Sequence, residues 1–391
     1  MPPPLSRRHL LRSLAGAGLT ALGASACASN DGSATADDTT GPATSSRPAS
    51  GAATGRTFGA EWERHARTFM CWPASTGIWD DQLPAVRADI AAVARAVGRY
   101  EPVVLFARPG QVDAAQQACG QEVEVVAMPV DDLWARDTLP VFVHDKAVLK
   151  GVDFNFNGWG DKQKEHGNDS RLAAAVLSKY GIPRIATPVV AEGGALETDG
   201  QGTLLVTESS VVNDNRNPGT SRDRIESELK AALGVTKVIW LAGVRGQDIT
   251  DAHVDCLARF VAPGVVLLDQ PFPGAPEDVW SRSSAQAKQV LKEATDAHGR
   301  PLRIVELPQP DPDLITGRGD AFVSSYINFY VANQAVFLPR FGDEAADRKA
   351  QEIVGDQFPD RDIVPLKIDA IAAGGGGIHC STHDQPGTPA S

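Results

Sequence analysis

The chain has 391 residues, of which 42% are hydrophobic and 22% are charged, and its formal net charge at pH 7 is −12. These proportions are those of a globular protein with a large core, and they exclude a chain that is disordered throughout. The acidic balance argues against a nucleic-acid partner or an anionic membrane surface and suits a cationic ligand, although many enzymes are equally acidic.

The N-terminus has the pattern of a twin-arginine export signal. Arg7 and Arg8 precede an apolar run rich in Ala and Gly at residues 14–26, which is shorter than the roughly 20 residues that a membrane span needs. Cys27 follows small residues and could carry a lipid, although Ala24 stands where lipoprotein signals usually have a larger aliphatic residue. We therefore predict an extracytoplasmic protein and leave a lipid anchor at Cys27 open.

A change of composition follows the signal. Residues 28–56 are rich in Ser, Thr, Ala, Gly, Pro and Asp and contain almost no large apolar side chain, so this segment cannot bury a core. The predicted organisation is therefore a signal at 1–27, a flexible tether at 28–56 and a catalytic domain at 57–391.

Beyond the tether, strand-like and helix-like segments alternate. Short apolar runs typical of buried strands lie at 103–106, 122–127, 141–149, 202–206, 238–241, 265–268, 336–338 and 363–366. Apolar residues spaced three and four apart, as in amphipathic helices, lie at 82–97, 170–180, 221–233, 284–295 and 344–354. This alternation predicts an α/β fold.

The cysteines and glycines indicate neither a structural zinc site nor a phosphate loop. No CxxC or Cys/His ligand spacing is present, and the four glycines at 374–377 are not followed by Lys-Ser or Lys-Thr. Export would permit disulfides, but a twin-arginine substrate crosses the membrane already folded, so its cysteines need not pair. We expect no nucleotide cofactor.

The clearest candidate nucleophile is Cys380. It follows the four glycines, which permit backbone conformations that other residues do not tolerate, so the thiol could approach a ligand closely. A lone cysteine is more often a small buried hydrophobe. If the segment is extended, His379 points to the opposite face from Cys380, and a partner base should come from elsewhere in the chain.

A candidate base is His253, which stands between two aspartates. In an extended segment Asp251, His253 and Asp255 share one face, which would place a proton-transfer group beside carboxylates that grip a cation. The alternative is a solvated acidic loop that contains one structural histidine.

Two further clusters hold acids. Asp137 follows Trp134 and Arg136 directly before a predicted strand, so the indole could pack against a planar cation while the carboxylate binds it; a surface ion pair of Arg136 is the alternative. Glu192 stands before two glycines, a pattern that alone is more typical of a turn.

Taken together, these segments resemble the agmatine deiminase and bacterial peptidylarginine deiminase family of the guanidine-modifying superfamily. The matching motifs occur in order along the chain: EWERH at 61–65, CWP at 71–73, WARDT at 134–138, EGG at 192–194, NDNRNP at 213–218, HVD at 253–255, SYINFY at 325–330, FPDR at 358–361 and the Cys380 loop. The resemblance implies a pentein, an α/β propeller of five pseudo-repeated ββαβ units around a central site.

The resemblance also implies the role of each site residue. The residues are Cys380 as nucleophile, His253 as acid and base, Asp137 and Asp255 as guanidinium clamps, Glu192 as the carboxylate that orients the histidine, and Trp134 and Asn328 as lining of the substrate channel. The thiolate would attack the guanidinium carbon and form a thiouronium, which water then hydrolyses. No metal or organic cofactor is implied.

The substrate implied by the resemblance is a small cationic guanidino compound. Residues 158–161 (GWGD) resemble agmatine deiminases, whereas the peptidylarginine type has arginines there that bind a carboxylate. We therefore expect agmatine and water to give N-carbamoylputrescine, a step of putrescine biosynthesis, and ammonia. Deimination of arginine to citrulline in peptides is the alternative. Leu139, His383 and Asp384 depart from the family pattern near the clamp.

Other classes of protein share part of this pattern. A guanidinium-binding lipoprotein would use the acidic clamps but has no need for Cys380 and His253 together. A cysteine peptidase is disfavoured because carboxylates beside the histidine poorly suit a neutral peptide carbonyl. An amidinotransferase shares the first half-reaction and differs only in the acceptor. The sequence does not indicate an oligomeric state.

Overall fold

The structure is a computed structural model that describes residues 55–387 except 318 and 320. The predicted export signal, the candidate lipid site at Cys27 and nearly all of the predicted tether lie outside the described residues. Among the described residues, no helix has both the length and the apolar character needed to cross a bilayer.

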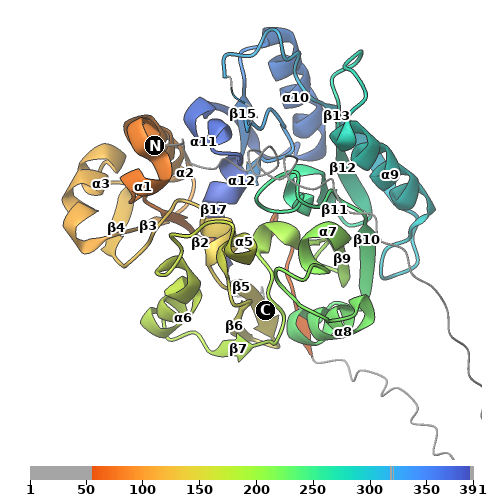
Figure 1. Ribbon diagram of the computed structural model, residues 1–391, viewed down its shortest axis with the longest axis horizontal. Coiled ribbons are helices and arrows are strands. Elements are labelled where there is room, and N and C mark those ends of the chain that lie inside the picture. Colours follow the sequence, from red (N-terminus) through yellow and green to blue (C-terminus); the bar gives the residue numbers. More distant parts are fainter. Residues whose placement is uncertain (1–54, 318, 320, 388–391) are drawn as a thin grey trace, which may run out of the picture.

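Five separate β-sheets surround a common centre in the described part of the chain (Figure 1). The first has the strand order β1 (Arg56–Thr57), β5 (Val141–Asp145), β6 (Val148–Asp153) and β7 (Arg184–Ala186). The second has β10 (Lys237–Leu241), β9 (Thr203–Thr207) and β8 (Glu197–Thr198). The third has β11 (Ala258–Ala262), β12 (Val265–Gln270) and β13 (Arg303–Pro308).

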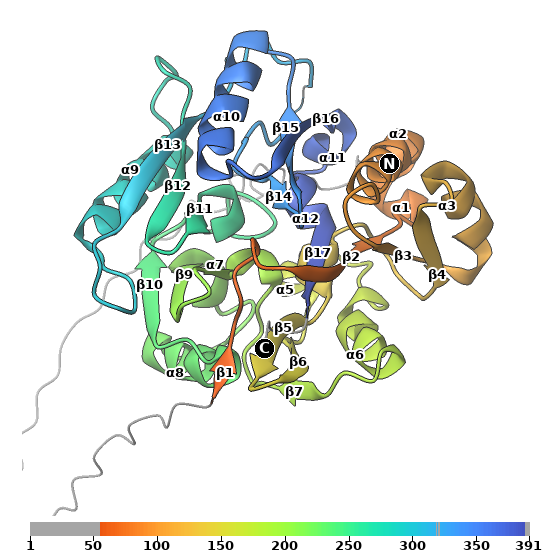
Figure 2. The same ribbon diagram turned by 180° about the vertical axis from the view of Figure 1, so that it is seen from behind.

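The fourth sheet has β14 (Tyr330–Val331), β15 (Ala335–Arg340) and β16 (Asp362–Lys367). The fifth joins the two ends of the domain, with the order β17 (Thr382–Pro386), β2 (His65–Cys71), β3 (Val103–Ala107) and β4 (Val123–Ala127). Figure 2 shows β17 beside β2, and the two strands pair antiparallel with Thr382 opposite Met70. The last strand of the domain therefore closes onto its first long strand.

Each sheet contains an antiparallel pair followed by a parallel pair. Parallel neighbours need a crossover connection, which is usually a helix. The crossover helices are α2 (Leu83–Val97), α3 (Val112–Cys119), α6 (Asp169–Lys179), α8 (Arg222–Leu233), α9 (Val279–Glu293) and α10 (Glu344–Gln357). They lie at the periphery (Figures 1 and 2), so loops and short helical turns occupy the centre.

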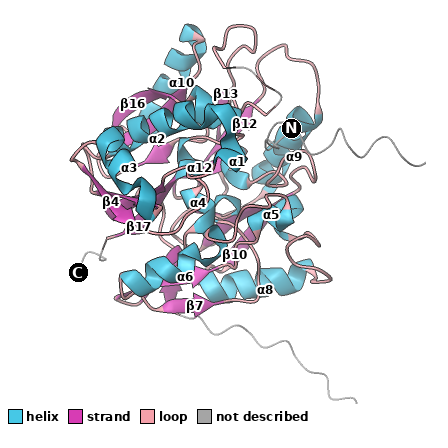
Figure 3. Ribbon diagram, turned by 60° about the vertical axis from the view of Figure 1, so that its left-hand side comes forward, coloured by secondary structure: helices cyan, strands magenta, loops and turns pink. Residues whose placement is uncertain are grey.

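The short turns carry several site residues. They are α1 (Thr76–Trp79), α4 (Ala135–Thr138), α5 (Gly158–Asp161), α7 (Glu208–Val211), α11 (Asp369–Ala373) and α12 (Ile378–Ser381). Figure 3 shows α4 and α12 next to each other in the interior, and their residues are in contact. Asp137 and Cys380 are thereby brought into one region from opposite halves of the chain.

Local sequence signals explain where the helices begin and end. Ser221 caps α8, because its side chain accepts a hydrogen bond from the backbone N–H of Arg224. Gly234 ends the same helix with φ of 77°, a conformation that favours glycine. The strand β3 is buried along its whole length, as its continuous apolar run predicts for a strand covered on both faces.

Two sequence predictions need correction at their boundaries. The strand expected across 141–149 is a hairpin of β5 and β6, in which Lys146 takes a φ of 57° at the turn. The helix expected at 284–295 begins at Val279, because the Asp278 side chain accepts hydrogen bonds from two backbone N–H groups of its first turn.

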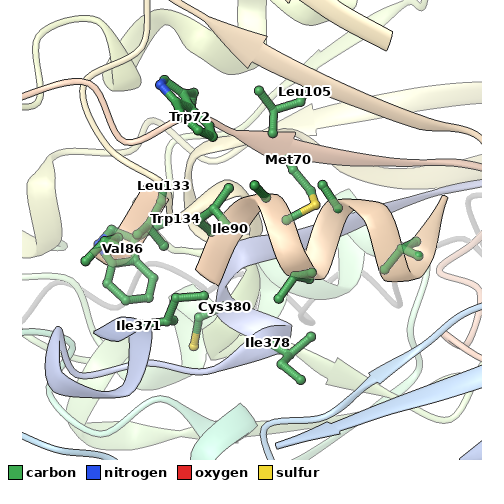
Figure 4. Close-up of a cluster of buried hydrophobic side chains, with 14 of the residues drawn as sticks. Met70, Trp72, Val86, Ile90, Leu105, Leu133, Trp134, Ile371, Ile378 and Cys380 are labelled. Carbon is green, nitrogen blue, oxygen red and sulfur yellow. The ribbon is translucent and has the colours of Figure 1, made fainter. Parts of the chain in front are cut away.

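The largest hydrophobic cluster lies between the fifth sheet, α2 and the loop that carries the candidate nucleophile. Figure 4 shows Cys380 in this cluster together with Trp134, Ile371 and Ile378. The thiol is fully buried. The core therefore supports one side of the candidate site directly.

Candidate active site

The backbone around Cys380 is a helical turn and not the extended segment expected from the sequence. The residue lies in α12, where its N–H donates to Asn328 Oδ1 at 3.2 Å. Asn328 Nδ2 lies 3.2 Å from the sulfur. A Cβ on Gly377 would lie 2.5 Å from Asn328 Oδ1, so only glycine permits this approach. The buried Asn328 amide thus fixes both the backbone and the thiol of Cys380.

Asp255 is in contact with the thiol. Its Oδ2 lies 3.4 Å from Cys380 Sγ and 2.9 Å from His379 Nδ1. The other ring nitrogen of His379 lies 2.9 Å from Glu61 Oε2. Burial and two nearby arginines lower the pKa of His379, but Glu61 and Asp255 outweigh them and raise it above its usual value. His379 therefore holds the carboxylate of Asp255 in place, and a base from elsewhere in the chain stays a prediction.

His253 is fully buried between two carboxylates. Its Nε2 lies 3.1 Å from Glu192 Oε2, and its Nδ1 lies 3.7 Å from Asp137 Oδ2. Burial lowers the pKa of His253, but Asp137 and Glu192 together raise it to about 9. The imidazole is therefore protonated at neutral pH and can give a proton to a leaving group.

The backbone before His253 is not extended, so Asp251 does not share a face with His253 and Asp255, whereas the latter two side chains still converge beside Gly194. Asp251 and Ala252 have φ of 60° and 65°, and a 3-10 turn follows at Val254–Cys256. Side chains impose this turn, since Asp248 accepts from the N–H of Ala252 and Thr250 accepts from that of His253. Asp251 points instead to an arginine.

That arginine is Arg216, which sequence reasoning did not assign to the site. Its Nε lies 2.8 and 3.1 Å from the two oxygens of Glu192, and its Nη1 lies 2.8 Å from Asp251 Oδ2. Lys162 Nζ lies 2.6 Å from the same Asp251 oxygen. Burial raises the pKa of Glu192, but Arg216 and His253 lower it below its usual value. A buried chain of alternating charges therefore holds the carboxylate that contacts the histidine.

Asp137 is held by donors on both oxygens. The indole N–H of Trp159 donates to Oδ2 at 2.9 Å, and the N–H of Gly194 donates to Oδ1 at 3.0 Å. Trp159 is fully buried with a φ of 56°. Sequence reasoning considered its segment only for substrate choice, whereas the structure makes Trp159 a direct partner of the predicted clamp.

Gly194 explains the glycines that follow Glu192. A Cβ at this position would lie 2.7 Å from His253 Nδ1, 2.8 Å from Asp137 Oδ1 and 3.0 Å from Asp255 Oδ2. Two carboxylates and one histidine therefore converge on a single small space that the missing side chain keeps open. A planar cation with N–H groups on several edges fits these acceptors, because each carboxylate can take hydrogen bonds from it.

The remaining predicted residues are also buried. Trp134 packs in the hydrophobic cluster of Cys380, with its ring centroid 6.1 Å from that of Trp79, and its contact with substrate stays a prediction. Arg136 is not in a surface ion pair, since it is buried and binds Glu61 at 2.7 Å and Asp384 at 3.0 Å.

A cavity of about 160 Å³ adjoins His253. Its acidic lining residues are Asp248, Asp269 and Asp278. Among the described residues, no lysine or arginine lines it. The cavity therefore favours a cation close to the clamp space.

Comparison with known proteins places the chain in a family. A family model described as Porphyromonas-type peptidyl-arginine deiminase matches residues 57–386. The chain belongs to this family. An agmatine deiminase of Stutzerimonas stutzeri is 38% identical over 350 residues, which cover 84% of this chain and 94% of the relative. An agmatine deiminase of Medicago truncatula is 35% identical over 358 residues, covering 84% and 95%.

A solved structure agrees with these relatives. The agmatine deiminase of Enterococcus faecalis is 32% identical and superposes with a TM-score of 0.78, covering 85% of this chain and 96% of that structure. The peptidyl-arginine deiminase family assignment confirms the resemblance and the α/β pentein fold. The protein is accordingly an enzyme, a guanidino deiminase.

Proposed function

We propose that this enzyme hydrolyses agmatine to N-carbamoylputrescine and ammonia. The observation that carries the proposal is the convergence of Asp137, Asp255 and His253 on the space beside Gly194, with the thiol of Cys380 in contact with Asp255. Two carboxylates, a protonated histidine and a thiol are the groups that hydrolysis of a guanidinium needs, because the cation is planar, resonance-stabilised and a poor electrophile.

In the proposed reaction, Asp137 and Asp255 hold the N–H groups of the guanidinium. The bound positive charge favours the thiolate of Cys380, which attacks the central carbon. His253 gives a proton to the departing nitrogen, ammonia leaves, and a thiouronium remains on the sulfur. Neutral His253 then takes a proton from water as the water attacks this carbon. The C–S bond breaks and releases the ureido product.

Agmatine is favoured over arginine by the charges around the site. Agmatine carries an ammonium where arginine carries a carboxylate, and the adjoining cavity is lined by three aspartates. Lys162 could otherwise have bound the carboxylate of arginine. Its Nζ lies 2.6 Å from Asp251 Oδ2 and also donates to the carbonyl of Asp248. The relatives named agmatine deiminase support this substrate.

The second candidate is deimination of peptidyl arginine. It is favoured by the family model itself, whose description names peptidyl-arginine deiminase and which matches residues 57–386. This substrate would require a cation near the site to bind the carboxylate of a C-terminal arginine.

An ammonia-release assay tests the proposal on agmatine, free arginine and a peptide with a C-terminal arginine. We expect agmatine to exceed both others at least about tenfold in kcat/KM, a difference of roughly 1.4 kcal/mol. A preference for the peptide would contradict this and favour the second candidate. Release of N-carbamoylputrescine without an added amine acceptor separates a hydrolase from a transferase.

The variant Cys380→Ala separates an enzyme from a binding protein. We expect it to release no ammonia while it stays folded, because the covalent step needs the thiol. Activity close to that of the unchanged enzyme would remove Cys380 from the mechanism.

We further propose that the enzyme is exported by the twin-arginine route, on the basis of its first residues. We also propose that the five sheets are the five pseudo-repeated units of a propeller. The antiparallel-then-parallel order common to all five supports this. A crystal structure in which the sheets are not related by rotation about the site would contradict it.

A further inference from the structure

A second thiol lies beside the nucleophile. The side-chain amide of Asn328 is 3.2 Å from Cys380 Sγ and 3.3 Å from Cys256 Sγ. The two sulfurs and a carboxylate oxygen of Asp255 all lie within 4.8 Å of one another. Both cysteines are thiols and not a disulfide. The proposed reaction assigns no step to Cys256, so its place here calls for another account.

The three side chains match the ligand set of a thiophilic cation. Zinc bonds a thiolate sulfur at about 2.3 Å and a carboxylate oxygen at about 2.0–2.2 Å, so two sulfurs on one tetrahedral ion lie about 3.8 Å apart. Small side-chain adjustments would therefore bring the two sulfurs and the Asp255 oxygen to the distances that one ion requires. Within the described residues, no second group of three such ligands meets this spacing.

We propose that Asp255, Cys256 and Cys380 bind one thiophilic divalent cation, of which Zn²⁺ and Cd²⁺ are examples, and that this cation inhibits the enzyme. Three protein ligands leave a fourth position for water, as in open zinc sites. His379 contacts Asp255 Oδ2 at 2.9 Å and would orient this ligand from outside the coordination sphere. Cys256 is half-buried and borders the adjoining cavity, which gives the cation a path inward.

Cation and substrate exclude each other in this arrangement. The cation takes the thiolate of Cys380 and the carboxylate of Asp255, the same groups that the proposed function gives to the guanidinium. The inhibition part of the inference rests on that proposed function, whereas the binding part does not. We therefore expect agmatine to relieve inhibition competitively.

Binding is tested on the full-length, metal-free protein by calorimetric titration with Zn²⁺ alone. Titration with Cd²⁺ adds the thiolate-to-cadmium charge-transfer absorption, which reports sulfur ligands directly. We expect one cation per chain and a loss of affinity of at least tenfold in Cys256→Ala and in Cys256→Ser. The matched control is Cys119→Ala, which removes a buried thiol at the end of α3 and should bind like the unchanged protein.

Inhibition is tested by comparing each variant with its own rate in the presence of a chelator. We expect Zn²⁺ to inhibit the unchanged enzyme at a concentration at least tenfold lower than it inhibits Cys256→Ala. Equal Zn²⁺ affinity in the unchanged protein and both Cys256 variants would overturn the proposal. If the protein lacks activity on agmatine but shows the cadmium band only with Cys256 present, the proposed function fails and the cation site stands.

Discussion

At the scale of single residues, the two proposed clamp carboxylates are held in place by hydrogen bonds within the protein itself. Asp137 takes hydrogen bonds from Trp159 and Gly194, and Asp255 is held by His379. Donors that fix acceptors in advance lower the reorganisation that the reaction requires. The proposed mechanism therefore uses each carboxylate both for its charge and for its fixed direction.

Replacing either clamp should reduce turnover strongly. Asp137→Asn and Asp255→Asn keep the size of the side chain but remove a charge from a buried ion pair with the guanidinium, a loss that costs about 2–5 kcal/mol. We expect kcat/KM for agmatine to fall accordingly, measured by ammonia release. Asp113→Asn, at an exposed position of α3, serves as the control. Near-normal kinetics in either clamp variant would remove that residue from the binding of the guanidinium.

The pH dependence should report on His253. The proposed reaction needs the protonated imidazole, and its pKa is raised to about 9 in the folded protein without substrate, so kcat/KM should fall as the pH rises through about 9. Glu192→Gln removes one of the charges that raise this pKa, and the alkaline limb should then move to lower pH. The measurement is a pH–rate profile of both enzymes. An unmoved alkaline limb would show that the limb belongs to another group.

The free energy of unfolding depends on the protonation of His253 in the same direction as the rate does. Because the folded pKa of His253 lies above the ordinary value of 6.5, its contribution to stability is fully present below pH 6.5 and is lost as the pH rises through about 9.

At the scale of elements, the loop between α7 and α8 supplies Arg216, which binds Glu192, the carboxylate in contact with His253. The atoms nearest to the space beside Gly194 belong to His253, Asp137 and Asp255, whereas Arg216 binds Glu192 and Asp251, so we regard it as a positioning residue. Its fully buried guanidinium group contacts the carboxylates of Glu192 and Asp251. Such a residue should affect the chemical step more than substrate binding.

We expect Arg216→Gln to lower kcat for agmatine at least tenfold and to change KM little. Arg216→Lys should recover part of the loss because it restores the charge without the fork. Breaking a buried ion pair costs about 3–5 kcal/mol, so urea unfolding must be measured alongside. Arg224→Gln, at an exposed position of α8, is the control. A rise in KM with unchanged kcat would indicate direct contact with the substrate instead.

The strand β17 carries a histidine that folding keeps neutral. His383 Nε2 lies 2.9 Å from the carbonyl oxygen of Pro140. In the described part of the chain, its Nδ1 has no hydrogen-bond partner. Burial and the nearby Arg136 lower the pKa of His383 to about 3. Below pH 6.5 the unfolded chain therefore binds a proton on His383, whereas the folded protein binds it only near pH 3. The free energy of unfolding consequently decreases as the pH is lowered through this range.

His383→Gln should reduce this acid sensitivity. The histidine contributes a loss of up to about 1.4 kcal/mol per pH unit between pH 6.5 and pH 3, and glutamine does not titrate. The measurement is the free energy of unfolding in urea at pH 7, 6 and 5 for both proteins. The slope of the free energy of unfolding against pH tests the prediction, because a repacking cost would lower all three free energies by the same amount and leave the slope unchanged. Equal slopes would mean that His383 does not govern the acid limb.

Local pattern was enough to predict the elements but not the contacts between them. The amphipathic spacing of α2 and the apolar run of β3 are visible in the chain, and both elements lie where expected. The backbone conformation of the segments that carry His253 and Cys380 was not predictable from local pattern. Side chains of Asp248 and Thr250 turn the chain before His253, and such bonds compete with the extended conformation.

The site was predictable to the extent that its motifs resemble a family. Glu192 with two glycines indicates only a turn when considered alone, and its meaning depends on side chains that approach Gly194 from distant segments. Trp159 was missed as a partner of Asp137 because nothing local couples an indole to a carboxylate 22 positions away. Arg216 stood inside a recognised motif, but its role depends on Asp251, 35 positions along the chain.

At the scale of the whole molecule, the predicted destination can be tested separately from the chemistry. Replacing Arg7 and Arg8 by lysines keeps the charge but removes the arginine pair that defines the signal. We expect the variant to remain in the cytoplasm with unchanged kcat and KM for agmatine. Cell fractionation and assays of the purified protein measure the two properties. Continued appearance outside the cytoplasm would exclude the twin-arginine route.

We expect the pairing of β17 with β2 to determine when the enzyme becomes active after synthesis. The two strands come from opposite ends of the catalytic domain, and contacts so distant along the chain form late because a long loop must close first. Cys380 directly precedes β17, so a chain still attached to the ribosome has not yet folded its nucleophile into place. We therefore expect a chain terminated before β17 to lack a folded site even if the other four sheets had formed.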